Sequence, residues 1–147
     1  IFASMNIDIH SIDASQDLPL PYAEEGIKAG FPSPAQDYMD LSIDLNRELV
    51  KHPSSTFYGK VKGDSMVDAQ VFDGDILIID KSLEPTNGDM AVCFVDGEFT
   101  LKFIEIRADE VLLVPANKQY APIRVTKEND FIIWGIVTYV IHKSRKR

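Results

Sequence analysis

The 147-residue sequence has one cysteine, three histidines and no hydrophobic run near the roughly 18 residues that a membrane-spanning helix needs. Because Cys93 is the only cysteine, no disulfide can form within the chain, and the first residues lack the basic, apolar and small-residue order of a secretory signal. These absences favour a cytoplasmic protein that does not enter a membrane. His10, His52 and His142 lack the spacing of zinc ligands, so we expect no metal and no cofactor.

Positive charge is scarce as well. The chain has 15 Lys and Arg residues against 23 Asp and Glu residues, which gives a net charge of −8. Some of the positive charges gather at the C-terminal end, namely Lys143, Arg145, Lys146 and Arg147, so the rest of the chain is more acidic still. An acidic body repels the phosphates of nucleic acids. We therefore expect no direct, specific DNA binding, and we interpret the basic end as a solvated terminus.

The N-terminal part, residues 1–33, shows no sustained period of either 2 or 3.6 residues and is interrupted by Pro19, Pro21, Gly26, Gly30 and Pro32. We interpret it as an extended arm, too short and too broken for a helix-turn-helix domain. The next segment changes character. Ser33, Pro34 and Gln36 fit a helix start, and apolar residues follow at helical spacing, at Tyr38, Leu41, Leu45 and Leu49. This pattern predicts one short amphipathic helix within residues 34–50.

From residue 56 onward the pattern is that of β-strands. Short apolar or alternating segments are predicted to be strands: TFYGKVK (56–62), DILIID (75–80), MAVCFV (90–95), EFTLKFIEI (98–106), VLLVPA (111–116), PIRV (122–125) and FIIWGIVTYVIH (131–142). Asp96-Gly97, between two of them, is a two-residue hairpin turn of type I′. The fold class is therefore mostly β, and residues 34–147 are expected to form one β domain. The lone Cys93 is interpreted as a small core residue.

Ser65 lies in a tight polar turn, VKGDSMVDAQ, which precedes an apolar strand. The turn is not a G-x-S-x-G elbow, and none of the histidines has a supporting acidic motif. Asp64, Asp68, Asp73 and Asp75 crowd the turn, but turn chemistry explains them better than a cation site. The remaining class of base for an activated serine is a lysine. An ordinary lysine is neutral in only about one molecule in 2,500 at pH 7, so such a lysine must be buried.

Lys102 is the lysine whose flanks are apolar, because Leu101, Phe103 and Ile104 surround it in one strand. Thr100 lies on the same face of that strand and could orient the amine. Lys60 and Lys62, by contrast, alternate as on a solvated face. A strand lysine can also extend its amine to solvent from a sheet edge, and the sequence leaves this alternative open.

The sequence resembles the LexA/UmuD family of self-cleaving SOS proteins in two motifs: GDSM with the nearby DGD, and further along the chain DGEFTLK. The similarity covers residues 30–142. GFPSPAQDY and IDLN are similar to UmuD in particular. The resemblance implies a β-clip-like catalytic and dimerisation domain with a Ser65–Lys102 dyad. It also implies a homodimer, stimulation of cleavage by a RecA-type filament, and an accessory role for an error-prone Y-family polymerase of the UmuC type.

The resemblance further implies a substrate within the chain. Family members cut their own arm between a small residue and glycine, and Ala29-Gly30 is the matching pair, although UmuD proteins have Cys where this chain has Ala29. A small residue followed by glycine lets the backbone approach a serine closely. Backbone N–H groups at Asp64 and Ser65 are the expected oxyanion donors. Two alternatives stay open: a non-enzymatic dimeric interaction module, and the C-terminal part of a LexA-like repressor.

Overall fold

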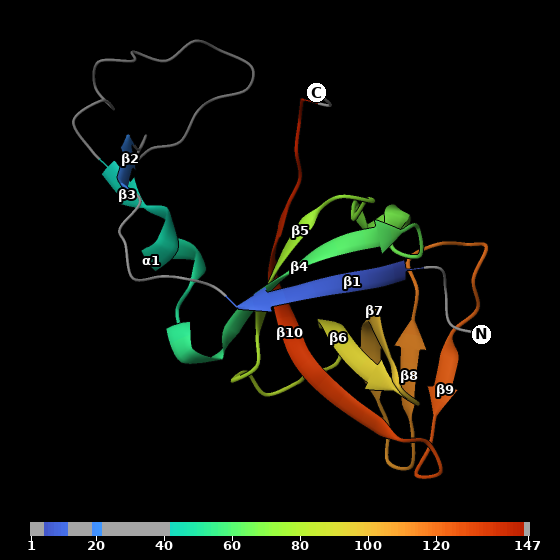
Figure 1. Ribbon diagram of the computed structural model, residues 1–147. Coiled ribbons are helices and arrows are strands. Elements are labelled where there is room, and N and C mark those ends of the chain that lie inside the picture. The colour runs from blue at the N-terminus through green and yellow to red at the C-terminus, as the bar shows by residue number, and fades with distance from the viewer. Residues whose placement is uncertain (1–4, 12–18, 22–41, 146–147) are drawn as a thin grey trace. The chain divides into compact units, whose positions relative to one another are not determined.

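The computed structural model describes residues 5–11, 19–21 and 42–145 (Figure 1). These residues fall into two units, one made of residues 1–12 and 54–147 and the other of residues 13–53. In the second unit, β2 (Pro19–Pro21) pairs antiparallel with β3 (Ser42–Asp44), and the short helix α1 (Leu45–Leu49) follows. In the described ranges, no helix is long and apolar enough to cross a membrane.

The helix predicted within residues 34–50 exists but begins later than its first capping signal. Residues 42–44, which fall inside the predicted range, are strand, and Asp44 is the N-cap. Its carboxylate accepts hydrogen bonds from the backbone N–H groups of Asn46 and Arg47, at 3.1 and 3.5 Å, which satisfies two amide donors of the first turn. Ser33, Pro34 and Gln36 lie outside the described residues.

The first unit is built on an eight-stranded antiparallel sheet in the order β1-β4-β5-β10-β6-β7-β8-β9, which confirms the mostly β fold class. Its strands are β1 (Met5–Ser11), β4 (Thr56–Gly63), β5 (Ile76–Asp80), β6 (Met90–Val95), β7 (Glu98–Ile106), β8 (Val111–Val114), β9 (Ile123–Val125) and β10 (Phe131–Ile141). Two single 3₁₀ turns, η2 (Pro53–Ser55) and η3 (Val67–Ala69), flank β4.

Strand β10 connects the two halves of this sheet (Figure 1). Its first half pairs with β6 and its second half with β5, and the register shifts between Ile133 and Gly135 and again between Val137 and Tyr139. Gly135 lies at the first irregularity, where an added Cβ would come within 2.5 Å of Ile79 Cγ2. The close approach of β5 and β10 therefore requires glycine at this position.

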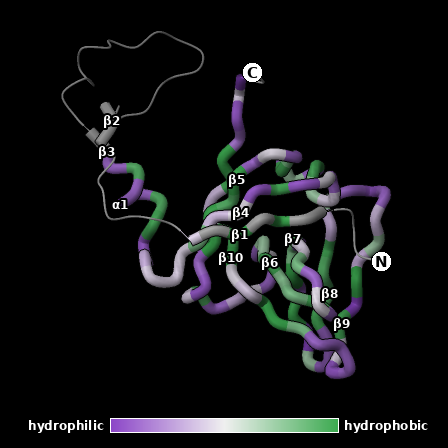
Figure 2. The backbone as a smooth tube through the Cα atoms, viewed as in Figure 1, coloured by the Kyte–Doolittle hydropathy of each residue, from purple (hydrophilic) through white to green (hydrophobic). Residues whose placement is uncertain are grey.

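The hairpin between β6 and β7 forms as its sequence predicts. Asp96 and Gly97 have φ values of 47° and 90°, and positive values at both positions are those of a type I′ turn. Hydrophobic residues lie along much of the strands, whereas hydrophilic residues predominate in the connecting turns (Figure 2). Alternate residues of β6 and β7 join two different core clusters: Val92 and Leu101 belong to one, and Ala91, Cys93 and Ile104 to the other.

The expected N-terminal arm contains more regular structure than its sequence suggests. Residues 5–11 form β1, which pairs with β4 over seven residues, and residues 19–21 form β2. Met5, Ile7 and Ile9 alternate with polar residues, but the alternation is short, and a strand at residues 5–11 was not predicted.

Candidate active site

Ser65 lies in the turn that follows β4. The turn begins at Gly63, whose φ of 110° favours glycine, and the Gly63 amide donates to Asp73 Oδ1 at 3.0 Å. Beyond Ser65 the chain enters η3, with a backbone hydrogen bond of 3.4 Å from the Val67 amide to the Asp64 carbonyl. Ser65 is 0% exposed. The serine is thus held in a short, closed turn and shielded from solvent.

The segment that follows β8 holds the serine turn in place through hydrogen bonds. The Ala116 amide donates to the Ser65 carbonyl at 2.9 Å, and the Ala116 carbonyl accepts from the Asp68 amide at 2.7 Å. The Asn117 side-chain amide donates to the Asp64 carbonyl at 2.8 Å, and the Tyr120 hydroxyl donates to the Asp64 carboxylate at 2.9 Å. We call Ala116, Asn117 and Tyr120 the clamp.

Lys102 reaches the serine from β7, a strand that is not a sheet neighbour of β4. Its side chain is 0% exposed, so it does not extend to solvent as the alternative interpretation required. Lys102 Nζ lies 3.4 Å from Ser65 Oγ, 2.6 Å from Thr100 Oγ1 and 3.0 Å from the Leu101 carbonyl oxygen. The distance to Ser65 is at the long end of hydrogen bonding, as is common for catalytic pairs before substrate binds.

Burial lowers the pKa of Lys102 from 10.5 to about 8. The physical cause is the loss of hydration, which disfavours the charged ammonium form. Among the described residues, no carboxylate lies within ion-pairing distance of this amine. Burial and the lack of a nearby carboxylate in the described part of the chain together leave a fraction of the Lys102 amine neutral at physiological pH.

The three oxygen atoms around Lys102 Nζ suit a neutral amine. Such an amine has two N–H donors and one lone pair. The two donors match the Thr100 hydroxyl oxygen and the Leu101 carbonyl, which are the nearer partners. The lone pair can then accept the Ser65 hydroxyl proton. This arrangement provides a general base for the serine without a histidine.

Cys93 lies in β6 directly across from Thr100 and is buried in the core, as predicted. Burial raises the pKa of the Cys93 thiol to about 12. A thiolate here would raise the pKa of Lys102, but the thiol stays neutral near pH 8. Cys93 therefore gives Lys102 no counter-charge in the pH range where the lysine titrates.

Hydrogen bonds to the Asp64 carbonyl fix the orientation of the peptide bond between Asp64 and Ser65. The Asp64 carbonyl is bound by Asn117 and Val67. In a trans peptide the N–H points opposite to the C=O, so the Ser65 N–H points away from the clamp. This direction is compatible with the expected oxyanion role, which stays a prediction for both amides.

A cavity of about 710 Å³ adjoins the serine turn. It is lined by turn residues, including Gly63, Asp64 and Val67, and by His142 and Lys143, which follow β10. His142 Nδ1 lies 2.6 Å from the buried carboxylate of Asp75, which holds this segment against the turn. Ser65 itself does not line the cavity, although its neighbour Asp64 does.

The remaining predicted site residues are Ala29 and Gly30, which lie outside the described residues. The aspartates of the turn take part in hydrogen bonds: Asp73 and Asp75 accept from backbone amides of the turn, Asp75 also contacts His142, and Asp64 accepts from Tyr120. Within residues 5–11, 19–21 and 42–145, no group of three or more His, Cys, Asp or Glu side chains is placed to hold a metal ion.

Sequence reasoning brought Ser65, Lys102 and Thr100 forward but missed the clamp. The segment PANKQY has the composition of an ordinary polar turn, with proline and asparagine. Its position over the serine depends on how β8 and β9 are placed in the sheet, and no local pattern carries that information.

Comparisons with known proteins identify relatives over most of the chain. Residues 21–138 match the Peptidase S24-like family. The chain is 38% identical to MucA of Salmonella typhimurium over 137 residues, which are 92% of this chain and 93% of that protein. It is 37% identical to SamA of the same species, over 85% of this chain and 86% of SamA. Against the LexA repressor of Stenotrophomonas maltophilia the identity is 33%, over 81% of this chain and 56% of the repressor.

Proposed function

Because the chain belongs to the Peptidase S24-like family, a family of self-cleaving serine peptidases, we propose that it cuts its own backbone with a Ser65–Lys102 dyad. The observation that carries the proposal is the contact of 3.4 Å between Lys102 Nζ and Ser65 Oγ, both in side chains that are 0% exposed. Among the described residues no carboxylate pairs with this lysine, and a buried amine with a lowered pKa beside a serine hydroxyl is typical of a general base.

The reaction follows from the positions of these groups. Neutral Lys102 takes the proton of the Ser65 hydroxyl, and Ser65 Oγ attacks the carbonyl carbon of the scissile peptide. Backbone N–H groups of Asp64 and Ser65 stabilise the oxyanion. Lys102 then gives its proton to the departing amine as the C–N bond breaks, and water hydrolyses the acyl-enzyme. Thr100 orients the lysine amine throughout, because its hydroxyl oxygen is the nearest partner of Nζ.

The proposed scissile bond joins Ala29 to Gly30. Both residues are small, so the backbone can lie close to the serine without a side-chain clash. The bond lies in the segment between β1 and β4, and cutting it separates residues 1–29 from the rest of the chain. Attack can take place within one chain or between two copies.

We place this reaction in a UmuD-like role in SOS mutagenesis. The similarity to MucA and SamA over most of their lengths supports this placement. In this role the protein is a homodimer, a RecA-type filament stimulates the cut, and the processed form assists an error-prone translesion polymerase of the UmuC type. Cleavage then acts as a switch that is used once per chain.

The test is release of the arm by purified protein at about pH 10 without any partner, where a buried lysine is neutral. Mass spectrometry should show a new N-terminus at Gly30 in the wild type. Ser65→Ala and Lys102→Ala should stay intact, and Lys127→Ala, which removes an exposed lysine, should behave as the wild type. Cleavage that survives Ser65→Ala or Lys102→Ala would refute the dyad. An unchanged mass in the wild type would instead favour a non-enzymatic interaction module.

A further inference from the structure

Strand β1 covers one edge of the sheet, and it belongs to the segment that the proposed cut would separate. It pairs with β4 over seven residues, from Met5 opposite Gly63 to Ser11 opposite Phe57. In the order of the eight strands, β1 is the outermost on this side and β4 is its neighbour (Figure 1). Without β1, β4 itself would be the edge.

The backbone groups of β4 divide into two sets. The Val61 amide donates to the Asp75 carbonyl at 2.9 Å, on the side of β5. Because successive amides of a strand point to opposite sides, the amides of Lys60 and Lys62 point toward β1, and so does that of Tyr58. Loss of β1 would leave this second set without strand partners.

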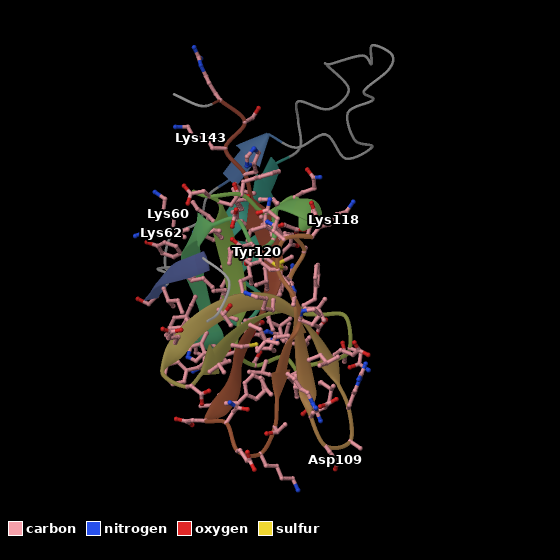
Figure 3. The ribbon with its side chains drawn as sticks, turned by 90° about the vertical axis from the view of Figure 1, so that its right-hand side faces the viewer. Lys60, Lys62, Asp109, Lys118, Tyr120 and Lys143 are labelled. Atoms are coloured by element: carbon pink, nitrogen blue, oxygen red, sulfur yellow. The ribbon has the colours of Figure 1, made fainter. Side chains whose placement is uncertain are left out.

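The side chains of β1 also contribute to the core. Ile7 is 8% exposed and belongs to the cluster that contains Val61 and Leu77, and Ile9 packs against the same cluster. On the other face of β4, Lys60 and Lys62 project together into solvent (Figure 3). Asp8, between the two isoleucines, lies opposite Lys60 in the register.

We propose that β1 is a removable cover and that processing turns the β4 edge into a binding site for an extended segment of another protein. This inference rests on the proposed cut at Ala29–Gly30, after which only non-covalent contacts hold β1. An intramolecular strand then becomes a bimolecular ligand and leaves on dilution. The exposed edge accepts a new strand by main-chain hydrogen bonds.

The sequence of β1 defines the chemistry of the occupant. The segment that fits this edge carries two β-branched side chains two residues apart, as Ile7 and Ile9 are, to fill the space beside Val61. The register puts Asp8 opposite Lys60, so we expect an acidic residue at this position of the new strand to be favoured. A partner protein with an extended Ile-Asp-Ile-like segment meets both requirements.

The experiment separates this inference from self-cleavage. The full chain with Ser65→Ala receives a recognition sequence for an added site-specific protease after Gly26, so that an external enzyme makes the cut. After gel filtration, NMR hydrogen exchange is measured at the Tyr58, Lys60 and Lys62 amides. Val61, in the same strand but bonded to the β5 side, is the internal control. Because the added protease makes the cut, a chain that cannot cut itself would fail the arm-release test at pH 10 but not this experiment.

We expect the fragment to separate and exchange at the three amides to become at least about tenfold faster, with Val61 and the β6–β7 amides unchanged. A synthetic peptide of residues 1–12 should restore protection, and the same peptide with Ile7→Asp and Ile9→Asp should not.

Four results would overturn the proposal. Unchanged exchange at Lys60 and Lys62 would mean that the edge stays closed, and equal restoration by the altered peptide would remove the side-chain specificity. Loss of protection throughout the sheet would make β1 a structural strand and not a cover. In addition, sedimentation that shows paired copies protecting the edge without peptide would assign the site to a second copy instead of a partner.

Discussion

The rate of arm release should follow the titration of Lys102. Only the neutral amine can accept the Ser65 proton, and burial lowers the pKa of this lysine to about 8. Its neutral fraction is then about one in eleven at pH 7, one half near pH 8 and nearly complete at pH 10. We therefore expect the rate to rise about tenfold from pH 7 and to level off above pH 9.

An exposed lysine would give a different curve. With a pKa of 10.5 the neutral fraction rises about 300-fold between pH 7 and pH 9.5 and does not level off in that range. The two cases differ both in the size of the increase and in the presence of a plateau, so first-order rate constants at half-unit steps from pH 6 to pH 10 distinguish them.

The assay follows the loss of intact chain on gels, with mass spectrometry to identify the arm. The variant Lys127→Ala should give the same curve as the wild type, because this exposed lysine lies far along the chain from β7, and Ser65→Ala supplies the uncut baseline. A rate that keeps rising tenfold per pH unit through pH 9.5 would refute the argument that burial activates Lys102.

Three further predictions concern stability and the groups around the dyad. The first compares the Ser65→Ala variant with and without an added Lys102→Met change. Between pH 8 and 10.5 the unfolded chain binds more protons at Lys102 than the folded chain does, so the free energy of unfolding of the protein that keeps Lys102, relative to the Lys102→Met protein, should rise by about 3 kcal/mol. Urea unfolding at pH 8 and at pH 10.5 measures this rise, and a difference that does not change with pH would contradict it. Thr100→Val removes the nearest acceptor of Lys102 Nζ and should lower the plateau rate of arm release at least about fivefold, whereas Thr100→Ser should restore it; equal rates in all three proteins would show that the hydroxyl is dispensable. Gly135→Ala places a Cβ within 2.5 Å of Ile79 Cγ2 and should destabilise the fold by about 1–3 kcal/mol in thermal unfolding; an unchanged melting temperature would mean that β5 and β10 can move apart freely.

The parts of the fold that depend on neighbouring residues were predictable from the sequence. The β6–β7 hairpin is the clearest case, because Asp96-Gly97 specifies the turn and apolar residues on both sides specify the strands. The apolar strand around Lys102 made burial one of two interpretations, and the pattern alone did not decide between burial and extension of the amine to solvent. The closeness of Lys102 to Ser65, by contrast, came from the resemblance of two motifs, because no periodicity relates the two residues.

The parts that depend on distant pairing were not predictable. The start of α1 at Leu45, with Asp44 as its N-cap, follows from the pairing of β2 with β3, which competes with the helical pattern before residue 45. The position of β1 requires a partner strand that follows residue 55 in the sequence. Asn117 and Tyr120 contact Asp64 only because the sheet brings β8 and β9 near the serine turn.

The distribution of the dyad over the sheet has a consequence for synthesis. Ser65 follows β4 and Lys102 lies in β7, and the strands β5, β10 and β6 lie between them in the sheet. Since β10 is the most C-terminal strand of the described sheet and pairs with both β5 and β6, we expect the base to reach the serine only after β10 has been made. A chain that ends before β10 would then carry Ser65 and the proposed scissile bond without the proposed dyad, so we expect the order of the strands to prevent self-processing during translation.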